Sequence, residues 1–279
     1  MSVPSFPSPH SQARREIALA LLVVLLTVLA LCGPVVANQA HQHAFADQRT
    51  LWGVPCALDV LSNLPFALAG VWGLAALLRQ RLQPWGCAVE ACAALFFVGL
   101  VLTACGSAWY HSHPDDAGLL WDRLGMAVAF AGMLGMAAAT RVSCRAGVGL
   151  AGLALVLAPA AAAWWAATGN VWAWVVVQVG GMLLLAALAA LPVERGMPVI
   201  RLAVVLGCYG LAKLLEAQDH AVWALTRGAV AGHALKHLLA AAAALPVLAA
   251  LLPRTGHHCV QNGAPGAQPW NRLMQRLGA

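Results

Sequence analysis

Apolar stretches long enough to cross a lipid bilayer recur along almost the whole of this chain. A membrane-spanning helix needs roughly 20 mostly apolar residues, and eight such stretches lie between positions 17 and 252. Only 9% of the 279 residues are charged, against about 25% in a typical soluble domain. The strands of a membrane β-barrel would instead alternate apolar and polar residues. The sequence therefore predicts an all-α fold, a polytopic membrane helix bundle.

The expected segments are a seven-helix body, one N-terminal helix before it and a polar segment at each end. The first apolar stretch is longer than the roughly 7–15 apolar residues of a signal peptide, so it is expected to be a retained helix. The boundaries are a disordered cytoplasmic head at 1–16, a leading transmembrane helix at 17–37, a periplasmic loop at 38–56, a seven-transmembrane body at 57–252 and a cytoplasmic tail at 253–279.

The arginines indicate the orientation of these helices. The net charge of +6 is spread over short loops between apolar stretches, where it reports topology and gives no indication of nucleic-acid binding. The loops at 14–15, 79–81, 141–145 and 195–201, together with position 254, fall on one side of the expected bundle. The positive-inside rule then predicts a multi-pass inner-membrane protein with both termini in the cytoplasm.

The most polar run inside the apolar part of the chain covers residues 106–122. Ser107 and His111 are four residues apart, so they share one face of a helix. Asp122 follows at the start of the next apolar stretch. All three belong to the opposite, Arg-poor side, the expected periplasmic face, which carries little beyond Arg49, Arg123 and Arg227. A hydroxyl, an imidazole and a carboxylate at one membrane edge are suited to hydrolytic chemistry.

A second polar pair lies in the last apolar stretch. His233 and His237 are also four apart, a spacing at which two imidazoles can bind one metal ion. With His111 they would supply three protein ligands and leave a fourth position for water, as in catalytic zinc sites. Imidazoles favour zinc over calcium or magnesium. Asp122 is then expected to serve as a general base for that water, and Ser107 to hydrogen-bond the water or the developing oxyanion.

Other polar residues of the body receive simpler interpretations. His113 is followed by a proline and is expected to lie outside the helix and away from the metal. Lys213 and Glu216 are three apart on one helix and are expected to form a structural ion pair, unless Glu216 serves Lys236 instead.

The pattern formed by Ser107, His111 and Asp122 with His233 and His237 resembles the alkaline ceramidase family. That family belongs to a superfamily of seven-helix membrane hydrolases that includes the adiponectin/progestin receptors. The resemblance extends from about residue 47 to residue 252, and the runs at 59–66 and 232–241 are similar to the bacterial branch.

This resemblance implies zinc held by the three histidines, with Ser107 and Asp122 acting on water at the metal. The implied reaction is hydrolysis of the amide of ceramide, or of a similar N-acyl lipid, to release a fatty acid. Animal members also bind calcium through an Asp-Trp-Cys-Glu run. Here Asp47, Trp52 and Asp59 are present without that run, and calcium is doubtful.

The leading hypothesis is therefore an intramembrane zinc-dependent lipid amidase whose partners are its lipid substrate and the bilayer. One alternative is a membrane receptor for a lipid or another ligand that keeps the zinc structurally and does not turn over. A haem carrier is a further alternative, although ligands one turn apart cannot reach opposite faces of a haem. A rhomboid-type serine protease is the last, although Ala and not Gly follows Ser107.

Overall fold

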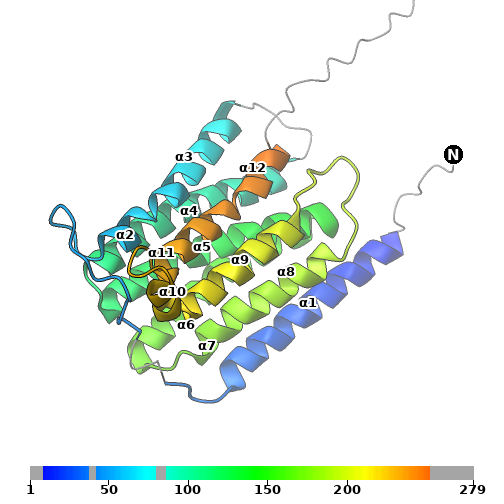
Figure 1. Cartoon of the computed structure of the whole chain (residues 1–279). Helices are drawn as coiled ribbons and strands as arrows, with labels where there is room; N and C mark the ends of the chain where they lie inside the picture. The colour runs from blue at the N-terminus through cyan, green and yellow to red at the C-terminus, as the bar shows by residue number, and fades with distance from the viewer. Residues whose placement is uncertain (1–8, 38–41, 80–85, 252–279) are drawn as a thin grey trace, which may run out of the picture.

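The structure, a computed structural model, describes residues 9–37, 42–79 and 86–251, and it is a bundle of helices within these ranges (Figure 1). Seven stretches of the described residues are long and apolar enough to cross a membrane. Together with the apolar, 16-residue α9, they give the predicted N-terminal helix and seven-helix body. The elements are α1 (Pro9–Cys32), α2 (Ala57–Leu61), α3 (Leu64–Arg79), α4 (Cys87–Ser112), α5 (Asp116–Arg141), α6 (Cys144–Thr168), α7 (Trp172–Val175), the π-helical turn η1 (Val176–Gly180), α8 (Gly181–Ala189), α9 (Leu202–Ala217), α10 (Asp219–Leu225), α11 (Gly232–Ala242) and α12 (Leu245–Leu251).

The leading helix differs from the predicted 17–37. It begins at Pro9, so the described part of the expected disordered head is helical, and proline is well tolerated in a first helical turn. Arg15 anchors this early part, because its guanidinium donates to the carbonyl of Arg141 at 3.2 Å and to Glu194 at 2.7 Å. The helix ends at Cys32 because Gly33 and Pro34 follow. The expected tail at 253–279 lies outside the described residues.

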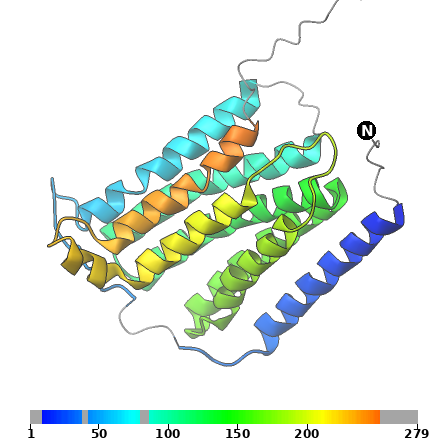
Figure 2. The same cartoon turned by 45° about the vertical axis from the view of Figure 1, so that its right-hand side comes forward.

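Helix α1 lies at the edge of the bundle. It contacts α7 and η1, and Figure 2 shows it along one side of the other helices. Most of its apolar side chains, such as Leu21 and Leu25, are exposed. A lipid-facing helix explains this exposure, because the bilayer itself solvates apolar side chains. The candidate site is therefore built by the seven-helix body without α1.

Helices α4 and α5 approach each other until their backbones touch. A Cβ atom added to Gly106 would lie 2.5 Å from the carbonyl oxygen of Trp121, and one added to Gly125 would lie 2.6 Å from the backbone nitrogen of Thr103. Small residues permit such close packing, which replaces the hydrophobic effect as the force between helices in lipid. The contact brings the face of α4 that carries Ser107 and His111 against the start of α5, where Asp122 lies.

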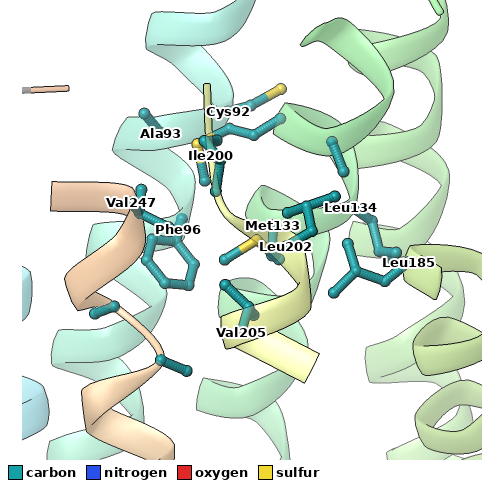
Figure 3. Close-up of a cluster of buried hydrophobic side chains, with 14 of the residues drawn as sticks. Cys92, Ala93, Phe96, Met133, Leu134, Leu185, Ile200, Leu202, Val205 and Val247 are labelled. Carbon is teal, nitrogen blue, oxygen red and sulfur yellow. The ribbon is translucent and has the colours of Figure 1, made fainter. Parts of the chain in front are cut away.

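Figure 3 shows part of the main apolar cluster of the bundle. It joins α4, α5, α8, α9 and α12, and its labelled members are Cys92, Ala93, Phe96, Met133, Leu134, Leu185, Ile200, Leu202, Val205 and Val247. Side chains from helices that are far apart in the sequence thus pack against one another in this cluster. The cluster fixes α4 and α5 relative to α9 and to the α11–α12 helix, which all contribute to the candidate site.

Within the body, the apolar stretches of the sequence predict helices at about 171–191, 198–217 and 227–252, and the structure differs from each of these three. The predicted span 171–191 is α7, η1 and α8 in sequence, because a π-helical turn interrupts the α-helix. The predicted helix 198–217 begins only at Leu202. The last predicted helix, 227–252, is α11 and α12, preceded by the short α10. The backbone at Arg227 (φ 53°) and Gly228 (φ 78°) is left-handed, which prevents a helix from continuing there.

Candidate metal centre

The three histidines predicted as ligands lie together in the structure. Their ring centroids are 4.7 Å apart for His111 and His233, and 4.9 Å apart for each of the other two pairs. One ring nitrogen from each residue lies within 4.8 Å of the other two, an arrangement that can hold a metal ion. All three side chains are buried, and His111 is 0% exposed. No other such group of His, Cys, Asp and Glu is found among the described residues.

Two helix ends bring these imidazoles together. His111 lies in the last turn of α4, and His233 and His237 lie one turn apart at the start of α11. The backbone N–H of His233 belongs to the first turn of α11, where no intrahelical acceptor is available. It donates instead to the Asp219 carboxylate of α10 at 2.7 Å. Gly232 allows this approach, because a Cβ atom there would lie 2.4 Å from the carbonyl oxygen of Leu215.

The hydrogen bonds of Ser62 select the tautomer of His237. The Ser62 hydroxyl donates to the carbonyl oxygen of Asp59 at 2.9 Å, and its oxygen lies 2.8 Å from Nδ1 of His237. Since the hydroxyl proton is already used, Nδ1 of His237 must carry the proton of that second bond. Nε2 then keeps its lone pair. A histidine that binds a metal through one nitrogen commonly donates from the other in this way.

His111 has the clearest need for a further partner. Both of its ring nitrogens are buried and have no hydrogen-bond partner. A buried unpaired nitrogen costs roughly 1–3 kcal/mol, and such groups are rare in folded proteins. A metal ion bound between the three rings would use one of these nitrogens. The donor set of neutral imidazoles therefore fits zinc, as the sequence indicates.

Lys236 competes with a metal at His233. Its Nζ lies 3.1 Å from Nε2 of His233 and donates to Glu216 at 2.7 Å. An ammonium group has only protons to donate, so the first contact uses the lone pair of Nε2. Glu216 also pairs with Lys213, so both ion pairs considered for Glu216 are present. Binding of a metal through Nε2 of His233 requires Lys236 to give up its contact with that nitrogen.

Ser107 and Asp122 lie beside the histidines. Oγ of Ser107 is 3.4 Å from Nε2 of His237, a long contact, and Ser107 also lies beside the side chain of Asp122. Both residues are buried. The structure thus brings all five residues selected from the sequence into one place, with the hydroxyl between the carboxylate and the imidazole of His237.

A cavity of about 280 Å³ begins at these residues and continues into the apolar interior. Ser107, Asp122 and His237 are part of its polar wall, and side chains from α4, α5, α8 and α9 are among those that line the rest. The apolar members include Phe96, Leu100, Met133, Leu134, Leu185 and Val205. A polar group at the end of an apolar cavity is the arrangement expected of a site for a lipid chain.

The segment before α2 covers the site from the end of the bundle. The ring of Phe45 packs edge-on against His111 and His233, with centroids 4.5 and 4.9 Å apart. The backbone N–H of Ala46 donates to the carboxylate of Asp219 at 2.9 Å, which also holds His233. One carboxylate thus fixes both a ligand helix and the cover over it.

In the same segment, Arg49 forms an ion pair with the carboxylate of Asp47. Its Nε and Nη2 donate to the two carboxylate oxygens at 2.8 and 2.7 Å. Burial alone would raise the pKa of Asp47, but the hydrogen bonds and the charge of Arg49 outweigh it and lower that pKa below its ordinary value. Of the other residues considered for calcium, Trp52 is exposed and Asp59 is buried with both carboxylate oxygens unpaired.

Four residues of the site were not predicted from the sequence: Ser62, Phe45 and Lys236 were not selected for it, and Asp219 had no predicted role. Ser62, Phe45 and Asp219 act through contacts between different elements of the fold, whereas Lys236 contacts His233 three residues before it on α11. Asp219 gives no local signal of this role, because it belongs to the first turn of α10 and not to the residues just before α11. His113 is exposed and stacks on Trp109, away from the three ligands as expected.

Comparison of the chain with models of protein families, with curated proteins and with solved structures finds no match. The resemblance described above therefore rests on the residues of the sequence alone.

Proposed function

We propose that the chain is an intramembrane zinc-dependent hydrolase that cleaves the amide bond of ceramide or of a similar N-acyl lipid and releases a fatty acid. One observation supports this proposal most. Three buried imidazoles lie together, with both ring nitrogens of His111 unpartnered, and His237 of this group lines an apolar cavity together with Ser107 and Asp122. A lipid chain in that cavity would present its amide to these side chains. This is also the activity that the resemblance to alkaline ceramidases implies.

The reaction adds one water to the amide and breaks its carbon–nitrogen bond. Zinc held by three imidazoles would lower the pKa of a water molecule that it coordinates. Asp122 accepts the proton that the water loses as its oxygen attacks the carbonyl carbon, and returns that proton to the nitrogen as the bond breaks. The products are a fatty acid and an amine, which together contain all the atoms of the amide and the water.

Ser107 assists at the carbonyl oxygen. Its hydroxyl lies between Asp122 and His237 and can donate a hydrogen bond to the oxygen as negative charge develops. A donor placed before the reaction starts contributes more in a water-poor site than in solution. The enclosure by Phe45 and the burial of Ser107 provide such a site. Ser107 acts here as a hydrogen-bond donor and the histidines as ligands, which is a different arrangement from a serine-hydrolase triad.

The proposed setting is the bacterial inner membrane, with both termini in the cytoplasm and the site towards the periplasm. The positive-inside rule supports this orientation. Arg15, Arg141 and Arg145 gather at the end of the bundle where Arg15 contacts the carbonyl of Arg141 and Glu16 pairs with Arg145. Arg141 ends α5, whereas His111 lies at the other end of the α4–α5 pair, in the last turn of α4 just before α5 begins.

The test combines metal analysis with lipid hydrolysis by the purified full-length protein. We expect about one zinc per chain, release of fatty acid from ceramide or another N-acyl lipid, loss of that release with a chelator and its return with zinc. His233→Ala should lose both the zinc and the activity. His113→Ala is the matched control, because His113 is exposed and stacked on Trp109.

Two outcomes would contradict the proposal in different ways. Fatty-acid release that a chelator does not reduce, or full activity in His233→Ala, would exclude the zinc mechanism. Stoichiometric zinc without turnover of any N-acyl lipid would favour the receptor alternative.

A further inference from the structure

Arg123 is a buried cation in the wall of the same cavity. It follows Asp122 on α5 and is 8% exposed. Its Nη1 is fully enclosed and has no hydrogen-bond partner. Both Arg123 and Asp122 line the cavity that begins at Ser107 and His237. The proposed hydrolysis gives Arg123 no task, so its charge needs a separate explanation.

The guanidinium of Arg123 makes cation–π contacts with two tryptophan rings. Its Cζ lies 3.8 Å from the ring centroid of Trp165 on α6 and 5.5 Å from that of Trp174 on α7. Such cation–π contacts stabilise the charge through its face. They leave the N–H groups at the edge of the guanidinium free to donate, and these are the groups that bind carboxylates in pairs.

The described part of the protein supplies no paired anion to Arg123. No ion pair among the described residues includes it, although Asp122 is its neighbour in sequence. Two other arginines of the described chain have a carboxylate partner, since Arg15 pairs with Glu194 and Arg49 with Asp47. A buried and unpaired charge in a membrane protein is costly and is functional by default. The missing anion is therefore expected to come from a ligand.

The location of Arg123 indicates which part of the ligand carries that anion. Trp165 lies in the last turns of α6 and Trp174 at the start of α7, at the same end of the bundle as the histidines. The apolar part of the cavity, around Phe96 and Met133, lies deeper in the bundle. An acyl chain would extend into this deeper part. The opposite side of the amide would remain near Arg123.

We propose that Arg123 binds a carboxylate on the amine side of the scissile amide, so that the preferred substrate is an N-acyl amino acid lipid and not a neutral ceramide. This inference rests on the proposed hydrolase function. The planar guanidinium matches a carboxylate with two parallel hydrogen bonds, and the two tryptophans hold it in place for that contact. The fatty acid released by hydrolysis also carries a carboxylate, so the experiment must separate the two sources.

The first experiment compares paired substrates on the purified zinc-loaded protein. One member is an N-octanoyl amino acid with a free carboxylate, and the other is its methyl ester. We expect kcat/KM to favour the free acid, and Arg123→Gln to lower that preference about 10- to 100-fold, mainly through KM. Arg123→Lys should keep part of the preference because it keeps the charge. Arg201→Gln is the matched control, since Arg201 is exposed and does not line the cavity.

The second experiment measures binding without turnover. Equilibrium dialysis of the radiolabelled N-octanoyl amino acid against metal-free protein should show a Kd that Arg123→Gln weakens by a similar factor. Octanoate competes weakly, and equally in both proteins, if the bound carboxylate belongs to the amino acid. A thermal unfolding scan of each variant shows that the binding change does not reflect loss of the fold.

These arms distinguish failure of the inference from failure of the proposed function. Equal hydrolysis of acid and ester by the wild type, with an unchanged ratio in Arg123→Gln, overturns the carboxylate site and leaves the hydrolase proposal standing. Arg123-dependent binding of the amino acid with no hydrolysis of any lipid supports the carboxylate site and contradicts the hydrolase. A third outcome is that octanoate binds as tightly as the N-octanoyl amino acid and that this binding depends on Arg123. The bound carboxylate would then be that of the fatty-acid product, which overturns the inference about the substrate.

Discussion

Nδ1 of His237 lies 2.8 Å from Oγ of Ser62, whose own proton is bound to the carbonyl oxygen of Asp59. This short chain of hydrogen bonds links two residues near the start of the body to a histidine of its last helix. It settles which nitrogen of His237 has a free lone pair. It also joins the end of α2 to α11 at the depth of the candidate metal.

Ser62→Ala should weaken zinc binding by about 10- to 100-fold, because the substitution removes the group that orients His237 and fixes its tautomer. Ser62→Thr keeps a hydroxyl at the same place and should retain most of the affinity. Competition with a chromogenic chelator measures both constants. An unchanged zinc affinity in Ser62→Ala would show that the tautomer of His237 is set by another group.

Gly125→Ala should destabilise the protein by about 1–3 kcal/mol, since the added methyl group would meet the backbone of α4 at Leu102 and Thr103. The matched control is Gly152→Ala on α6, where no atom lies within 4 Å of the added Cβ. Thermal unfolding of the detergent-solubilised protein compares the two. A similar melting temperature for both variants would contradict the close packing of α4 against α5.

Lys236→Met should strengthen zinc binding, on the order of tenfold or more, because it removes a cation 3.1 Å from Nε2 of His233. Lys213→Met is the control, since Lys213 pairs with the same Glu216 without the contact to His233. Zinc affinity, and not activity, is the readout because Lys236 also lines the cavity. Weaker zinc binding in Lys236→Met would mean that the ammonium supports the site.

Acid should remove the stabilisation that Asp47 provides. Arg49 lowers the pKa of Asp47 in the folded protein, so the unfolded chain binds this proton more tightly. The resulting stability is complete above the ordinary pKa of an aspartate, roughly 3.9, and is lost as the pH falls through the lower folded-state value. Asp47→Asn should therefore melt at a lower temperature than the wild type at pH 6, and the difference should shrink toward pH 3.

The measurement for Asp47 uses protein with a chelator present. Protonation of the three histidines would otherwise release zinc in the same range and obscure the comparison. A constant difference between wild type and Asp47→Asn from pH 6 to pH 3 would show that the ion pair does not stabilise the fold.

Local sequence patterns predicted the spans and the five residues selected for the candidate site. The length and apolarity of each stretch are enough to predict a helix in a membrane, because lipid leaves no other way to satisfy the backbone. The spacing of Ser107 from His111, and of His233 from His237, places each pair on one helical face. The alternation of spans and arginine-bearing loops then places both pairs at the same end of the bundle.

Features that depend on tertiary contacts were not predictable in this way. The π-helical turn at Val176–Gly180 interrupts a stretch whose composition is mostly apolar. Phe45 covers the histidines from a loop of ordinary composition, and Ser62 reaches His237 from the other end of the body. In the sequence, Arg123 is only one of a few arginines on the Arg-poor side. Its enclosure between Trp165 and Trp174 is what distinguishes it.

The distance along the chain between His111 and the His233–His237 pair has a consequence for biogenesis. Chains are synthesised from the N-terminus, so α4 and α5 exist before α11 has left the ribosome. Until then a nascent chain carries one imidazole of the three, and it cannot retain a metal at this position. On the proposed function, metal loading would therefore follow the insertion of the last helix, because a chain that stops before α11 lacks two of the three ligands.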